Sequence, residues 1–248
     1  MRRRNRAWQR SDAEAYATCW LHFEGCEQPS QTSRRPSRKQ LPELNRWTPP
    51  DGWDRRSLPS EMEALIAEAT RWIQAFEDCG RRLVPQCVAA DFTEVARVLL
   101  AIREAGWLPG CKFLELGSGY GIVTMLASMI GFDAVGVEAS DSLVHRSREF
   151  ARSRSIAAEF IVGDFVPLNF SAVGADRVSP TLSHRGHSDG DECPIDWDDH
   201  ALLYSYPWPG EHELHERMVR QYARPGAGYI QFRGPADLAI FSVGHTLR

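Results

Sequence analysis

The 248-residue chain lacks several features that would place it in particular classes of protein. It has no run of 18 apolar residues, so no membrane-spanning helix is expected. Its basic N-terminus is not followed by the apolar core of a secretory signal, which predicts a cytoplasmic location. The six cysteines include no C-x-x-C pair and no zinc-site spacing, so we expect free thiols. Cys193 is near His184, His187 and His200 in the sequence, but we interpret this stretch as a polar loop and expect no metal.

Charge is distributed unevenly along the chain. The net charge of -4 argues against binding of a polyanion over the whole surface. Residues 1–57 differ from the rest, because basic residues cluster at 2–10 and 34–39 with Ser, Gln and Pro between them. This composition predicts a basic, largely disordered arm. An arm that binds nucleic acid or an acidic partner is the alternative interpretation.

The remainder has the size and composition of one α/β domain with an appendage. With 43% hydrophobic residues the chain can bury one sizeable core. The apolar spacing predicts helices over 60–76 and 92–105, the second capped by Asp91. We therefore expect a helical cap over residues 58–106 and an α/β domain over residues 107–248.

The chain is organised around residues 112–121, KFLELGSGYG. A short apolar run containing Glu115 breaks into three glycines at alternate positions, which predicts a buried strand that ends in a tight turn. A helical pattern follows over 122–130. Strand, glycine turn and helix in this order are the first half of a nucleotide-binding βαβ unit. Glycines suit such a turn because a ligand can approach the backbone closely and because positive φ angles cost them little.

The second half of this unit is also present. Residues 132–137 have a strand pattern that ends at Glu138, where a carboxylate can accept hydrogen bonds from two ribose hydroxyls. The glycine spacing is G-x-G-x-G, whereas the dinucleotide fingerprint is G-x-G-x-x-G and would need a glycine at Ile122. Glu115 would repel a pyrophosphate but would suit a cationic amino group.

ELGSGYG followed by Glu138 resembles motif I and the next acidic motif of class I S-adenosylmethionine-dependent methyltransferases. The similarity runs from about Val84 to about Gly234, and the chain resembles a bacterial group whose fourth strand ends in YPWP. The resemblance implies that Glu115 lies near the methionine amino group and that Glu138, with Ala139, holds the ribose. It also implies a turn beneath the methionine and sugar, which is formed by Gly117, Ser118, Gly119, Tyr120 and Gly121.

Two later strand ends extend the resemblance. A strand over 158–162 is followed by Asp164 and Phe165, which resemble the adenine-binding motif of the family. The strand over 201–206 ends in Ser205-Tyr206-Pro207-Trp208, which is similar to the [D/N/S]-P-P-[Y/F/W] motif of N-methyltransferases, with tyrosine in place of the first proline. By this resemblance Ser205 is a cofactor-site residue, the Tyr206 backbone carbonyl holds the target nitrogen, and Trp208 stacks on the substrate. His212, which follows, is a candidate general base.

The remaining pattern predicts the topology. Helices over 142–153 and 211–222 and a strand over 228–232 complete a single doubly wound α/β domain of strand order 3-2-1-4-5. Because the chain ends soon after Ile240 and Phe241, we expect five or six strands. The Pro-, Gly- and Asp-rich loop over 166–199 is either a substrate lid or a solvated segment.

The function expected from these features is methyl transfer from S-adenosylmethionine to an unknown acceptor, with an amine nitrogen as one candidate. The departures from the N-methyltransferase motif leave a non-catalytic S-adenosylmethionine-binding module open. A protein-lysine methyltransferase is a narrower alternative, and a nucleotide-dependent oxidoreductase is disfavoured by Glu115 and Ile122. A small molecule, a protein side chain and a nucleic acid all remain open as acceptors.

Overall fold

Apolar runs with few charges form the five parallel strands of the sheet. The computed structural model describes residues 41–78, 89–167, 170 and 195–244. Within it, five strands run parallel: β2 (Lys112–Leu116), β3 (Asp133–Glu138), β4 (Glu159–Val162), β5 (Leu202–Ser205) and β6 (Gly228–Gly234). The inner ones β2, β5 and β6 are largely buried on both faces, as apolar strands covered by helices must be.

Over the described residues the sheet has seven strands in the order β1-β7-β6-β5-β2-β3-β4. The central order confirms the predicted doubly wound topology, but the expectation of five or six strands is wrong. Strand β7 (Asp237–Val243) folds back on β6 as an antiparallel hairpin, and β1 (Leu44–Arg46) pairs with β7. The strand that completes the edge thus comes from residues 41–57, the end of the expected arm.

Backbone and side-chain bonds tie this N-terminal segment to the sheet. The Trp47 amide donates to the Ile240 carbonyl at 2.8 Å, and the Arg220 guanidinium donates to the Pro42 carbonyl at 2.8 Å. The expectations for residues 1–40 and for most of the 166–199 loop, including its histidines and Cys193, lie outside the described residues.

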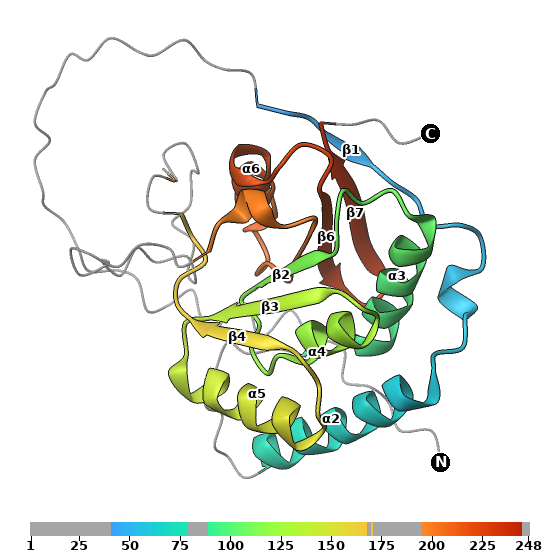
Figure 1. Cartoon of the computed structure of the whole chain (residues 1–248), viewed down its shortest axis with the longest axis vertical. Coiled ribbons are helices and arrows are strands. Elements are labelled where there is room, and N and C mark those ends of the chain that lie inside the picture. Colours follow the sequence, from blue (N-terminus) through green and yellow to red (C-terminus); the bar gives the residue numbers. More distant parts are fainter. Residues whose placement is uncertain (1–40, 79–88, 168–169, 171–194, 245–248) are drawn as a thin grey trace, which may run out of the picture. The chain divides into compact units, whose positions relative to one another are not determined.

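Helices cover both faces of the sheet (Figure 1). Apolar side chains of α3 (Phe92–Ala105), α4 (Ile122–Met129) and α5 (Asp141–Ser153) share one hydrophobic cluster, whereas those of α6 (His212–Tyr222) belong to a second cluster on the opposite face. The cap helix α2 (Ser60–Asp78) adds Trp72, whose ring stacks on Phe150 with 5.0 Å between centroids. In the described part of the chain, no helix combines the length and apolarity needed to cross a membrane.

The topology places a binding site at one edge of the sheet. Strands β2 and β5 are neighbours in register, with Leu116 beside Ser205, yet their following helices, α4 and α6, pack on opposite faces. The region beyond the carboxyl ends of these two strands, called the crevice below, is therefore the position where doubly wound folds bind ligands.

Candidate functional site

The glycine turn after β2 adopts the conformation that its sequence predicts. Gly117, Gly119 and Gly121 have φ angles of 77°, 52° and 72°, in the left-handed region where a side chain would be strained. The amides of Gly117 and Ser118 both donate to the Val137 carbonyl, at 3.0 and 2.7 Å. The turn is therefore fixed against the end of β3.

The three glycines have different surroundings. A Cβ on Gly121 would lie 2.3 Å from the buried Phe160 ring, so this glycine is required for packing between the turn and β4. Gly117 is exposed and Gly119 is half-buried, which leaves their backbone open to a ligand. Tyr120 is buried with its ring 5.4 Å from that of Trp72. The structure therefore assigns the open part of the turn to Gly117 and Gly119.

Glu115 is a buried carboxylate at the carboxyl end of β2, with 4% of its surface exposed. Its Oε2 accepts hydrogen bonds from the backbone amide and the hydroxyl of Thr124, at 2.8 and 2.5 Å. Its Oε1 receives none from the residues that the structure describes. Burial, with a smaller contribution from Glu138, raises the pKa of Glu115 to about 8 against the Thr124 hydrogen bonds that lower it. A cation beside Oε1 would favour the ionised form.

Glu138 closes the turn from the end of β3. Its Oε2 accepts from the Gly119 amide and its Oε1 from the Ser140 amide, both at 2.9 Å. A carboxylate has about four acceptor sites, so each oxygen can still accept a ligand hydroxyl. The side chain is half-buried, and the β2–β3 register places Glu115 beside Gly136, two residues before Glu138 on the same face of the sheet. Ala139, beside it, is exposed.

The end of β4 reaches the same crevice. The Asp164 carboxylate accepts from the Val166 amide at 2.8 Å and remains half-buried. The Phe165 ring is the nearest neighbour of the space above Gly117, at 3.6 Å from a Cβ built there. The same ring lies 5.5 Å from the His215 ring of α6. Phe165 therefore joins the glycine turn to α6.

The predicted residues at the end of β5 are only partly brought to this crevice. Ser205 is fully buried, and its hydroxyl shares a 2.8 Å hydrogen bond with the Tyr229 hydroxyl, so it presents no surface to a ligand. Tyr206 and Trp208 are half-buried. The Tyr206 ring packs edge-on against Phe232 at 4.8 Å, which orients its backbone at the strand end.

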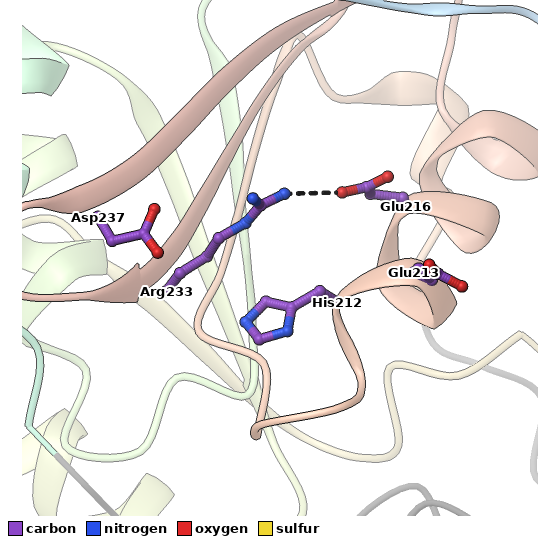
Figure 2. Close-up of a pocket in the computed structure, with 5 residues that line it drawn as sticks. All are labelled: His212, Glu213, Glu216, Arg233 and Asp237. Carbon is purple, nitrogen blue, oxygen red and sulfur yellow. Dashed lines mark hydrogen bonds and ion pairs between the residues drawn. The ribbon is translucent and has the colours of Figure 1, made fainter. Parts of the chain in front are cut away.

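His212 begins α6 and lies beside a hollow of about 460 Å³. Its Nε2 is buried without a hydrogen-bond partner among the described residues. Burial lowers the pKa of His212, and Arg233 lowers it further, so the imidazole is neutral near pH 7. The hollow also contacts Glu213, Glu216, Arg233 and Asp237, but it does not include Tyr206 or Trp208 (Figure 2).

Sequence reasoning missed a polar network on β6. The Gln231 side-chain amide donates to the Tyr229 hydroxyl and to the His212 carbonyl, both at 3.0 Å, and its oxygen accepts from Arg233 at 2.7 Å. The signal was the alternation of Tyr229, Gln231 and Arg233 along one face of the strand. It also missed two buried groups whose polar atoms have no hydrogen-bond partner within the described ranges: the Tyr204 hydroxyl and His215 Nδ1.

Solved structures provide the comparison of this fold with known proteins. An RNA methyltransferase from Salinibacter ruber in complex with S-adenosyl-L-homocysteine is 16% identical, with 65% of this chain and 97% of that chain covered and a TM-score of 0.44. An S-adenosylmethionine-dependent methyltransferase from Clostridium acetobutylicum is 11% identical, with 66% and 56% covered and a TM-score of 0.40. The CcbJ methyltransferase from Streptomyces caelestis is 16% identical, with 55% and 47% covered and a TM-score of 0.35.

Comparisons with protein-family models and with curated proteins found no match. The chain spans about half the length of the second and third structures above. The function is therefore inferred from the residues of the site itself.

Proposed function

We propose that the protein transfers a methyl group from S-adenosylmethionine to an amine nitrogen. The observation that carries this proposal is the pair of carboxylates on either side of the glycine turn. Glu138 is oriented by two backbone amides with acceptor sites to spare, and Glu115 is buried with Oε1 free of hydrogen bonds from the described residues. One carboxylate suits a ribose and the other suits an ammonium group, and an adenosyl amino acid carries both.

The residues around the crevice fit such a ligand. The exposed backbone of Gly117 and the half-buried backbone of Gly119 leave room for close approach. Asp164 and Phe165 supply an acceptor for an exocyclic amino group and an aromatic face for a base. Of the predicted cofactor residues, Ser205 is fully buried with its hydroxyl bonded to Tyr229, and Gly121 packs on Phe160, so these two would support the site rather than contact the ligand.

When bound, S-adenosylmethionine supplies a methyl group on a positively charged sulfur, which leaves as a neutral thioether. The protein must then align an acceptor, exclude water and remove a proton from an ammonium group. Neutral His212 can accept this proton at Nε2, which has no hydrogen-bond partner within the described part of the chain. The strand-end motif makes the Tyr206 carbonyl and the Trp208 ring further candidate positioning groups for the acceptor, outside the hollow that His212 lines.

The pair of carboxylates disfavours a dinucleotide cofactor. A pyrophosphate carries negative charge, so the Glu138 carboxylate would repel it, and it would keep the buried Glu115 carboxyl protonated instead of forming an ion pair with it. Tight NAD binding would contradict this reasoning and favour the oxidoreductase alternative.

Incubation of the protein with methyl-labelled S-adenosylmethionine and a cell extract tests the proposal. We expect release of S-adenosylhomocysteine and transfer of label to an amine-containing species. Calorimetric binding without turnover would favour the non-catalytic module, and label on protein lysines would favour the protein-lysine methyltransferase. A His212→Gln variant that retained full turnover would exclude the proton-accepting role of His212.

A further inference from the structure

The hollow beside His212 is lined by one histidine and four charged side chains. It lies between the first turns of α6 and the β6–β7 hairpin, at the carboxyl edge where the proposed methyl donor binds. Figure 2 shows the His212 ring, the Arg233 guanidinium and the Asp237 carboxylate directed toward the space between the hairpin and the helix. Its role as an acceptor site rests on the proposed function, whereas its ligand preference follows from its charges.

Arg233 is held in place by its neighbours. Its Nε donates to the Gln231 oxygen at 2.7 Å and its Nη2 donates to Glu216 at 3.0 Å. Gln231 is fully buried and bonded in turn to the Tyr229 hydroxyl and the His212 carbonyl. The guanidinium therefore fixes α6 against β6, and Glu216 balances its charge.

The remaining charges around the hollow are negative. Glu213 and Asp237 add two carboxylates beyond the Arg233–Glu216 pair, and His212 is neutral because burial and Arg233 lower its pKa. Glu94 of α3 lies behind the hairpin, where it accepts from the Ala236 amide at 3.2 Å. Burial raises the Glu94 pKa, and Asp91 and Asp237 raise it further. An incoming phosphate would meet repulsion here, whereas an ammonium group would meet attraction.

We propose that this hollow binds the methyl acceptor as a protonated primary or secondary amine, with Asp237 as its main charge partner and His212 as the group that receives its proton. In that step the N–H bond breaks, the proton moves to Nε2 of His212, and the nitrogen keeps the electron pair with which it attacks. The neutral imidazole becomes an imidazolium, which returns its proton to solvent after the product leaves. An acceptor that is a nucleic acid would not meet this charge pattern.

Binding of three small aromatic compounds tests this assignment without knowledge of the natural acceptor. At pH 7.5 benzylamine is a cation, benzyl alcohol is neutral and phenyl phosphate is an anion. Calorimetry and side-chain imidazole NMR would be run on the full chain with and without S-adenosylhomocysteine. We expect benzylamine to bind at least about tenfold more tightly than benzyl alcohol, with changes in the His212 resonances.

The matched variants are Asp237→Asn and Glu159→Gln. Asp237→Asn should weaken benzylamine binding by about fivefold to tenfold because it removes one charge partner. Glu159→Gln makes the same charge change at the exposed start of β4, the opposite edge strand, and should leave binding unchanged.

Several outcomes would overturn the assignment: equal binding of benzylamine and benzyl alcohol, imidazole changes only at other histidines, or tighter binding of phenyl phosphate or a single-stranded RNA at this site. The calorimetry on the same samples separates the two proposals. S-adenosylhomocysteine binding without a preference for the amine overturns the acceptor assignment alone, whereas amine selectivity without S-adenosylhomocysteine binding overturns the proposed cofactor.

Discussion

The glycine-turn crevice and the hollow beside His212 lie at the same edge of the sheet but are built differently. In the crevice, backbone amides orient Glu138, and Glu115 is bonded to Thr124 on the following helix, so the geometry arises within one βαβ unit. In the hollow, side chains from β6, β7 and α6 hold one another across separate elements. Local backbone geometry fixes the first region, and tertiary side-chain contacts fix the second.

A Gly121→Ala variant should cause the largest loss of stability, because it disrupts the backbone geometry of the glycine turn. The new Cβ would lie 2.3 Å from Phe160 at a φ of 72°, so both overpacking and backbone strain apply. We expect a loss of about 3 to 4 kcal/mol in the free energy of unfolding, measured by urea denaturation.

Gly210→Ala is the matched control, because Gly210 has a φ of 96° with nothing within 4 Å of a new Cβ. It should cost only the backbone strain, about 1 to 2 kcal/mol. Equal losses for the two variants would show that Phe160 does not constrain the turn.

Glu138→Gln should have the next largest effect, because it keeps the shape of the side chain but replaces one acceptor by a donor. The amide group cannot accept from both Gly119 and Ser140. We expect a loss of about 2 kcal/mol in S-adenosylhomocysteine binding, or roughly 30-fold in Kd, by calorimetry. Benzylamine binding in the hollow should change far less, and an equal loss of both ligands would remove the distinction between the regions.

Tyr229→Phe tests the side-chain network that supports the hollow beside His212. It removes the hydroxyl that joins Ser205 to Gln231, and the pKa of this buried tyrosine is raised by burial, so the hydroxyl is neutral. The Ser205 hydroxyl and the Gln231 amide would each lose a hydrogen-bond partner, and we expect the free energy of unfolding to fall by about 1.5 kcal/mol. Benzylamine binding should weaken more than S-adenosylhomocysteine binding, and the reverse order would contradict the separation of the two regions.

His215→Leu should have a small stabilising effect near neutral pH. His215 is buried and its Nδ1 has no hydrogen-bond partner in the described ranges, so removal of the polar ring should raise stability by about 1 kcal/mol at pH 7.5. Burial, with a smaller contribution from His212, lowers the His215 pKa from 6.5 to about 3. The unfolded chain therefore binds more protons between these values, and the histidine destabilises the fold as the pH falls below 6.5.

The stabilisation by His215→Leu should accordingly grow as the pH is lowered from 7.5 to 5, by about 2 kcal/mol. Thermal unfolding at the two pH values measures this, with the exposed His145→Leu as a control that should show no such growth. Destabilisation of the variant at both pH values would show that His215 has a structural partner.

Much of the crevice could be predicted from sequence because its signals are local. The predicted strand, turn and helix over 112–130 agree with β2 and α4, and Asp91 caps α3 by accepting from Thr93 and Glu94 at 3.0 Å, as expected. The positive φ angles follow from the glycine spacing itself.

The rest could not be predicted because it depends on contacts between distant residues. Strand β1 is three residues long with no alternating pattern, and its extended conformation depends on pairing with β7, about 200 residues away. Ser205 was assigned to the ligand site by resemblance, but its partner is a tyrosine hydroxyl on the neighbouring strand. Arg233, Glu216 and Asp237 meet only after β6, β7 and α6 have packed together.

The measurement that tests the central claim most directly is the number of protons released when S-adenosylhomocysteine binds at pH 6.5. Because the pKa of Glu115 is about 8 in the free protein, this carboxyl is protonated before an ammonium group arrives and ionised afterwards. Calorimetric titrations in two buffers of different ionisation enthalpy should show release approaching one proton for the wild type and none for Glu115→Gln, which should bind about tenfold more weakly. Equal affinity of the two proteins without proton release in either would contradict the account.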